Sequence, residues 1–263
     1  MKVLAVLCIR NEAVHLRRCL SDLIASGVDV YLIDNGSTDA SRGIASEFLG
    51  RGLVAIEDLA WTGEYSLPAI LRAKQRVIAA CDYDWIIHAD ADEWLCSPVD
   101  GQSLFEGIAE ADSAGYNCIN FHEIVFVPLP GENFVGEDYT ARMSTYYFFQ
   151  KYYPRLQRAW ARHAGANNVD LAGHRLSGAG VKQYPKDFFL RHYIVLSEAH
   201  ARAKYLGRPY SREGLSRGWH TNKLTITADN LRVKRVPGLW RMEDPGKQRF
   251  NLSMPLRRHF WEW

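Results

Sequence analysis

Apolar residues in the first part of the chain form continuous runs that alternate with segments of helical spacing. Residues 2–9 and 28–33 are nearly continuous apolar runs, as expected for buried parallel strands. Apolar side chains recur at helical spacing over residues 13–24, Gly27 ends that helix, and a second helix is predicted from about residue 40 to 49. The order strand, helix, strand, helix predicts an α/β fold with a mostly parallel sheet flanked by helices.

A third apolar run, residues 85–89, leads directly into the carboxylates of Asp90, Asp92 and Glu93. Adjacent carboxylates repel one another and resist burial unless a cation neutralises them. Asp90 and Asp92 are two residues apart, so in an extended segment both side chains leave the same face. Oxygen ligands suit Mg²⁺ or Mn²⁺, which proteins commonly hold with one or two carboxylates and substrate phosphates. The pattern therefore indicates a metal site, and a solvated acidic turn is the alternative.

Polar segments follow all three predicted strands. Arg10, Asn11 and Glu12 follow the first strand, Asp34 opens the segment after the second, and the acidic cluster follows the third. Ligands of open α/β sheets bind beyond the carboxyl ends of the strands. We therefore expect these polar groups to converge on one edge of the sheet.

These segments together resemble the nucleotide-sugar-binding half of a family-2 glycosyltransferase with the GT-A fold. The motifs are Arg-Asn-Glu at residues 10–12, Asp-Asn-Gly-Ser-Thr-Asp at 34–39 and the D-x-D sequence within 89–93, and the resemblance covers roughly the first 125 residues. It implies that Asp34 contacts the nucleobase or ribose and that residues 10–12 line the nucleotide pocket. It also implies that Asp92 coordinates the Mn²⁺ or Mg²⁺ bridging the diphosphate, whereas Asp90 holds the ribose or the metal.

The activity implied by the resemblance is metal-dependent transfer of a sugar from a nucleoside-diphosphate sugar, with a UDP-sugar favoured. The acceptor would be a hydroxyl of a glycan or lipid-linked molecule in cell-surface polysaccharide or glycolipid synthesis. Inverting members use a carboxylate base from a Glu-Asp pair, which is absent from the expected region, so Asp170 is the best substitute. The alternatives are a non-catalytic nucleotide-sugar or carbohydrate-binding protein on this fold, and a nucleotidyltransferase, whose usual Gly-rich phosphate loop is missing.

Histidines in the second half could complete the site. In GT-A glycosyltransferases a late histidine often supplies another metal ligand, and His192, at the end of an apolar run, is the preferred match. A lone histidine is, however, more often structural. Further candidates for contacts with the acceptor or the diphosphate are His174, Arg191, Lys204 and His220.

Residues 116–128 alternate between apolar and polar positions, which predicts a half-buried strand. Its polar members are Asn120, His122 and Glu123. They could face the sugar, and the alternative is that they are surface residues of an amphipathic strand.

Charge differs sharply between the two parts of the chain. Residues 1–150 carry 22 acidic and 10 basic side chains, whereas residues 151–263 carry 8 acidic and 22 basic ones. The basic part could serve an anionic acceptor, a diphosphate or a membrane surface, or it could neutralise the acidic part across an intramolecular interface. A nucleic-acid partner is not expected, because no nucleic-acid-binding motif accompanies the charge.

We predict one glycosyltransferase domain over residues 1–230, with a nucleotide-sugar half to about residue 125 and an acceptor-side half after it. Residues 231–263 form a predicted basic, Trp-rich C-terminal extension, which could contact an anionic lipid-linked acceptor or the protein's own surface. No apolar run is long enough to span a membrane, and the opening run lacks a signal-peptide pattern. These features predict a cytoplasmic protein with peripheral contact at the inner face of the membrane. The five cysteines form no C-x-x-C pair and are predicted to be buried thiols.

Overall fold

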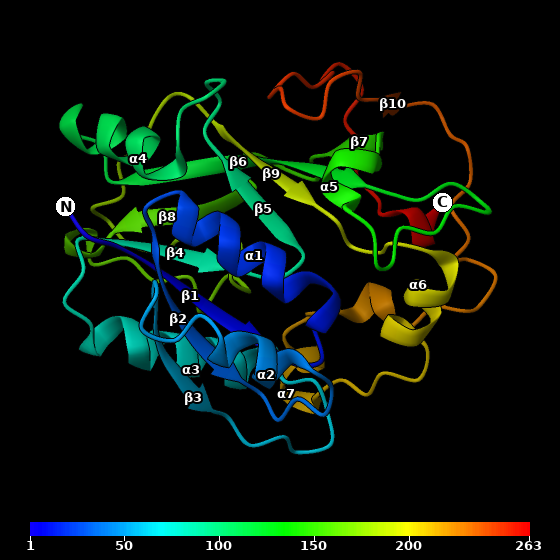
Figure 1. Cartoon of the computed structure of the whole chain (residues 1–263), viewed down its shortest axis with the longest axis horizontal. Helices are drawn as coiled ribbons and strands as arrows, with labels where there is room; N and C mark the ends of the chain where they lie inside the picture. The colour runs from blue at the N-terminus through cyan, green and yellow to red at the C-terminus, as the bar shows by residue number, and fades with distance from the viewer.

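One mixed β-sheet runs through the computed structural model, which describes residues 1–263 (Figure 1). Its strands lie in the order β10-β7-β6-β8-β4-β1-β2-β3, and β9 pairs with both β5 and β6. The first four strands are β1 (Val3–Ile9), β2 (Asp29–Asp34), β3 (Leu53–Asp58) and β4 (Trp85–Ala89). All neighbouring pairs among these four are parallel. The predicted α/β fold and the strands at 2–9, 28–33 and 85–89 are therefore confirmed.

Helices cover both faces of this parallel part. They are α1 (Ala13–Ala25), α2 (Ser41–Ser46), α3 (Leu67–Ala80) and α4 (Leu104–Ser113). Val3, Ala5 and Leu7 of β1 belong to the same core cluster as α1 and α4, whereas Leu4 and Val6 belong to the cluster that contains α3. Because successive side chains of a strand point to opposite faces, the continuous apolar run of β1 supports helices on both sides. Figure 1 shows α1 across the face turned to the viewer.

The later strands form the antiparallel part of the sheet. They are β5 (Glu93–Cys96), β6 (Cys118–Phe126), β7 (Thr145–Phe149), β8 (Leu156–Ala161), β9 (Phe188–His192) and β10 (Leu239–Arg241). Only the pairing of β6 with β9 is parallel here, so the whole sheet is mixed and its parallel character is concentrated in β3-β2-β1-β4. The predicted half-buried strand over 116–128 corresponds to β6. All but one of its residues are buried, because side chains on both of its faces belong to core clusters.

Short helices follow the later strands. They are α5 (Tyr139–Arg142), α6 (Glu198–Tyr205), α7 (Arg212–Ser216) and three 3₁₀ turns, Arg162–Ala164, Thr221–Lys223 and Phe260–Glu262. In Figure 1, α6 and the C-terminus lie beyond the carboxyl end of β1. These late segments thus close over the edge where the first strands end. No helix of the structure is both long and apolar enough to cross a membrane.

Residues 231–263 pack against the rest of the protein. Strand β10 extends the sheet by pairing with β7, and Leu231, Val233, Phe260 and Trp261 join a core cluster with residues of β6 and β7. Only 3% of the surface of Trp261 is exposed. Of the two contacts expected for the Trp-rich segment, Trp261 makes the one with the protein's own surface.

Candidate functional site

A cavity of about 540 Å³ opens at the carboxyl ends of β1 and β4. Both parts of the sheet and the late helices contribute to its wall. The lining residues come from the segments 8–12, 65–70, 88–93, 149–158, 170–175, 192–194, 204–210, 218–223 and 257–262, together with Asn35 and Glu123. A cavity beyond the strand ends is the usual ligand position in open α/β sheets. The convergence expected from the sequence is found for all three polar segments, the second of which reaches the wall through Asn35.

The acidic cluster occupies a tight turn between β4 and β5. The backbone N–H of Glu93 donates to the carbonyl of Asp90 at 3.1 Å, so residues 90–92 are not extended. The expectation that Asp90 and Asp92 leave one face of an extended segment is therefore wrong. The turn directs the two carboxylates to different cations.

Asp90 is held by two cations from different parts of the chain. Its carboxylate lies 3.0 Å from the guanidinium of Arg158 on β8 and 3.5 Å from the ammonium of Lys74 on α3. Both cations are almost fully buried, and Arg158 also pairs with Glu93. Burial raises the pKa of Asp90, but Lys74 and Arg158 outweigh burial and hold that pKa well below its usual range.

Asp92 has a different pair of cations. Its Oδ2 accepts a hydrogen bond from the Lys204 ammonium on α6 at 2.7 Å, and it lies 3.5 Å from Nε2 of His192. The Lys204 ammonium also donates to the carbonyl of Ile194 at 3.0 Å, which fixes its position. Burial raises the pKa of Asp92, and the charges of Lys204 and His192 more than reverse that effect.

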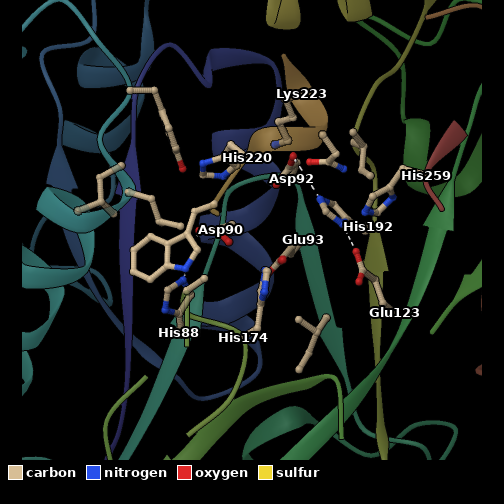
Figure 2. Close-up of a pocket in the computed structure, with 18 of the residues that line it drawn as sticks. His88, Asp90, Asp92, Glu93, Glu123, His174, His192, His220, Lys223 and His259 are labelled. Atoms are coloured by element: carbon tan, nitrogen blue, oxygen red, sulfur yellow. Dashed lines mark hydrogen bonds and ion pairs between the residues drawn. The ribbon is translucent and has the colours of Figure 1, made fainter. Parts of the chain in front are cut away.

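His192 links Asp92 to a second carboxylate. Its Nδ1 lies 2.9 Å from Glu123 of β6, and Figure 2 shows Asp92, His192 and Glu123 in one line joined by dashes. The line exists because β9 pairs with β5 on one side, where His192 stands opposite Glu93, and with β6 on the other. Burial lowers the pKa of His192, but the two carboxylates outweigh burial and raise it to about 10.

The residues around Asp92 fit a divalent cation that is completed by substrate. No group of three or more His, Cys, Asp or Glu side chains is arranged so that it alone could hold a metal ion. Asp92 and His192 are nevertheless a carboxylate and an imidazole beside each other, and the second imidazole nitrogen is bonded to Glu123. Metal-binding histidines usually have such a carboxylate partner, and Mg²⁺ and Mn²⁺ take their remaining ligands from phosphate and water. The Lys204 ammonium, 2.7 Å from Asp92 Oδ2, would compete with a metal ion for this carboxylate.

The first two polar segments are joined by their own hydrogen bonds. Asn11 Oδ1 accepts from the backbone N–H of Thr38 at 2.7 Å, and Asp34 Oδ1 accepts from that of Ser37 at 2.9 Å. Neither Asn11 nor Asp34 lines the cavity, whereas Arg10 does. The Arg10 guanidinium donates to backbone carbonyls of the second segment. Asn11 and Asp34 thus shape the loops here, and Arg10 is the side chain presented to the cavity.

Glu12 also lines the cavity, without an ion pair or a side-chain hydrogen bond. Burial and the nearby carboxylates raise its pKa to about 7, against the opposing effect of Lys204 and Arg208. A carboxyl group in this state can exchange a proton near neutral pH.

Three further candidates from the second half, Asp170, His174 and His220, lie on the cavity wall. Asp170 is exposed at the cavity wall and has no ion pair, and His174 and His220 line the same cavity. His220 packs between the rings of Tyr65 and Tyr210. Burial lowers the pKa of His220 to about 3, so its imidazole is neutral.

Arg191 does not face the cavity. Its fully buried guanidinium donates to the backbone carbonyls of Pro245 and Lys247 at 2.8 Å and packs against Trp94. Because side chains alternate along β9, placing His192 in the cavity turns Arg191 to the opposite face. Its position does not agree with the expectation that Arg191 contacts the acceptor or the diphosphate.

Several site residues were not singled out from the sequence. Lys74 lies on the apolar face of α3 between Leu71 and Val77, and a lysine at such a position could have been noticed in the sequence. Arg158 lies on β8, where all six residues are buried and no alternation marks it. The others are Arg155, Lys223 and His259. Glu123, which the sequence analysis considered both for contact with the sugar and as a surface residue, lines the cavity.

Residues 5–121 match the family described as Glycosyl transferase family 2. Over 87 residues the chain is 34% identical to a TPR repeat-containing protein of Synechococcus elongatus, an alignment that covers 33% of this chain and only 19% of that relative. The family match extends from β1 into β6. It includes Arg10, Asp34 and Asp92, whereas His192, Lys204 and Asp170 lie outside it.

Solved structures of S. aureus TarS are similar to most of the chain at low sequence identity. The structure of its residues 1–349 has a TM-score of 0.47 at 12% identity, and the same fragment in complex with UDP has 0.48 at 11%. Both alignments cover 89% of this chain and 76% of the other. A further TarS structure has a TM-score of 0.45 at 10% identity and covers 81% of this chain, which spans 41% of it.

Proposed function

We propose that this protein transfers a sugar from a nucleoside-diphosphate sugar, with a UDP-sugar favoured, to a hydroxyl of a glycan or lipid-linked acceptor. The observation that carries the proposal is the position of the family match. The strands of the matched segment, residues 5–121, end at the cavity that contains Arg10, Asp90 and Asp92. This is where a donor would meet both the carboxylates and the cations.

Crowded cations at one end of the cavity suit the donor diphosphate. Arg208 and Lys223 line the wall near Lys204 and form no ion pair. Burial and the charges of Arg208 and Lys204 lower the pKa of Lys223 to about 7. A bound diphosphate would supply the missing negative charge, so its binding and the protonation of Lys223 favour each other.

Asp92 and His192 are the residues that would hold Mn²⁺ or Mg²⁺, with Glu123 orienting His192. The metal would act as a Lewis acid that stabilises negative charge developing on the departing diphosphate. Lys204 is next to that position and is available to the diphosphate once it releases Asp92. Asp90, paired with Lys74 and Arg158, is better placed to fix the turn than to bind a metal.

Asp170 is our candidate for the base. Only two carboxylates of the cavity wall, Glu12 and Asp170, have neither an ion pair nor a side-chain hydrogen bond, and Glu12 lies at the end with Asp92 and Lys204. In an inverting displacement the acceptor oxygen bonds to the anomeric carbon while the bond from that carbon to the phosphate oxygen breaks. The nucleoside diphosphate leaves with the electron pair, and the hydroxyl proton passes to Asp170.

A nucleotide screen tests the proposal directly. Melting temperature would be measured with UDP, GDP, ADP and CMP, each with and without Mn²⁺, followed by hydrolysis of the matching nucleotide sugars. We expect one nucleoside diphosphate to stabilise the protein in a metal-dependent way. Asp92→Asn should abolish that effect, whereas Asp82→Asn, an exposed carboxylate that pairs only with Lys2, should preserve it. Failure of every nucleotide to stabilise the wild-type protein would contradict the proposal, and metal-dependent binding without turnover would favour a non-catalytic binding protein.

A further inference from the structure

The cavity wall carries more cations than its carboxylates engage. The ion pairs inside it involve Lys204, Arg155, Arg158 and His192. Six lining cations form no ion pair. One of them, Arg10, donates to the backbone carbonyls of Asn35 and Gly36, and the other five fall into two groups. Arg208 and Lys223 belong to the donor end, and the second group consists of Lys151, Arg175 and Arg257.

Three segments bring the second group together. The backbone N–H of Gln150 donates to the carbonyl of Leu256 at 2.9 Å, so the segment that carries Lys151 runs alongside the segment that carries Arg257. The guanidinium of Arg175 lies 4.8 Å from the ring centre of Tyr152, the residue after Lys151. The three cations therefore occupy one wall, built from residues 149–155, 170–175 and 256–261, which we call the basic wall.

Aromatic rings form the rest of the basic wall. Phe149, His259 and Trp261 stack in succession, with centroid distances of 3.9 and 4.6 Å. Tyr152 keeps 38% of its surface exposed, between the guanidinium groups of Arg155 and Arg175. Exposed aromatic rings pack against the apolar faces of sugars, and neighbouring guanidinium groups bind carboxylates and phosphates through paired hydrogen bonds.

We propose that the basic wall is the acceptor subsite and that it selects an acceptor saccharide carrying a carboxylate or phosphate group. Tyr152 supplies the surface for the sugar ring, and Lys151, Arg175 and Arg257 supply the counter-charges. Asp170 lies five residues before Arg175 in the same loop, so a saccharide held on this wall has its hydroxyl groups near the proposed base. This inference rests on the proposed glycosyl transfer.

Binding of matched probes tests the charge preference without requiring turnover. Glucose, glucuronate and glucose 6-phosphate differ mainly in charge, so their dissociation constants for the wild-type protein with UDP and Mn²⁺ can be compared by calorimetry. We expect the two anionic probes to bind at least about 10-fold more tightly than glucose, because each charge-assisted hydrogen bond is roughly twice as strong as a neutral one. The better of the two identifies the acid group. Equal binding of all three probes would overturn the inference.

Substitutions locate the effect on the basic wall. Lys151→Gln, Arg175→Gln and Arg257→Gln should each weaken binding of the anionic probe several-fold and leave glucose unaffected, and the triple variant should abolish the preference. Arg235→Gln, an exposed cation outside the cavity, controls for the loss of one positive charge. Equal weakening by the control would overturn the inference.

The donor experiment keeps this inference separate from the proposed function. The melting-temperature shift caused by the nucleoside diphosphate and Mn²⁺ should be the same in the triple variant and the wild type. Loss of that shift in the triple variant would assign the basic wall to the donor and overturn the acceptor subsite. Absence of the shift in the wild type would instead contradict the proposed function itself.

Discussion

The parallel and antiparallel parts of the sheet contribute opposite charges to the same cavity. The turn after the parallel strand β4 supplies Asp90 and Asp92, whereas β8, β9 and α6 supply Arg158, His192 and Lys204. The opposite net charges of the two halves of the sequence therefore meet as specific ion pairs. Because Lys151, Arg175 and Arg257 remain unpaired, neutralisation within the protein accounts for only part of the basic excess.

Asp90 and Asp92 differ in how deeply their partner cations are buried. Asp90 is held by cations whose side chains are at most 5% exposed, although the Asp90 side chain itself is 40% exposed. The side chains of Lys204 and His192 beside Asp92 are 11% and 18% exposed, and that of Asp92 is 14% exposed. Displacing a buried cation from its carboxylate carries a larger desolvation cost than displacing a cation nearer the cavity surface. We therefore expect Asp90 to keep its two cations, and we propose Asp92 as the carboxylate that exchanges its cation for a metal.

The largest effect is expected from Asp170→Asn, which removes the carboxylate that we propose as the base. General base catalysis is typically worth about 10²–10⁴-fold, so the transfer rate should fall by that factor while nucleotide binding stays unchanged. Rates would be measured with donor and acceptor at saturation. Asp229→Asn, an exposed carboxylate outside the cavity, is the control. A larger loss in Glu12→Gln than in Asp170→Asn would assign the base to the parallel half and contradict the assignment to the later half.

The first half of the site was readable because its chemistry lies in short contiguous motifs. The segments 10–12, 34–39 and 90–93 each follow a strong apolar strand, and parallel strands bring their carboxyl ends together whatever the loops contain. The sequence did not show that residues 90–92 turn. That geometry depends on Glu93 starting β5, a strand formed only by pairing with β9, far away in the chain.

The second half was less readable because its residues reach the site through long-range pairing. His192 was singled out, yet its link to Glu123 depends on β9 lying between β5 and β6. Arg191 and His192 are adjacent in sequence, and one residue of register decides which of them faces the cavity. A single sequence contains no direct signal for that register.

Arg158→Met should produce the next largest effect, on stability. Removing this guanidinium leaves Glu93 buried without its cation and Asp90 with Lys74 alone. Breaking a buried ion pair by removing one partner typically costs about 3–5 kcal/mol. Urea unfolding would measure this cost, with the exposed Arg162→Met as the matched control, for which we expect less than about 1 kcal/mol. A small cost for Arg158→Met would show that the pairs around Asp90 are no more fixed than those around Asp92.

Lys204→Met separates the two roles of the cation beside Asp92. Loss of the ammonium removes a contact proposed for the diphosphate, so nucleoside-diphosphate affinity should fall by about 10- to 100-fold, as expected for one charge-assisted interaction in a partly enclosed site. Mn²⁺ alone should bind more tightly, because Lys204 no longer competes for Asp92. Calorimetry with each ligand separately measures both effects. A parallel loss of nucleotide and Mn²⁺ affinity would indicate that Lys204 supports the metal site rather than competing with it.

Glu123→Gln should give the smallest of these effects, because Glu123 would act on the proposed metal site only through His192. Replacing a carboxylate that orients a metal-binding histidine typically lowers metal affinity by about 10- to 100-fold, and we expect the lower end because the Gln side chain can still accept the hydrogen bond from Nδ1 of His192. Mn²⁺ affinity would be measured by calorimetry on variants with melting temperatures recorded beforehand, since Arg155 also loses its carboxylate partner. Glu132→Gln, an exposed residue outside the cavity, is the matched control. Unchanged Mn²⁺ affinity in a folded Glu123→Gln protein would show that the Glu123 carboxylate does not support metal binding through His192.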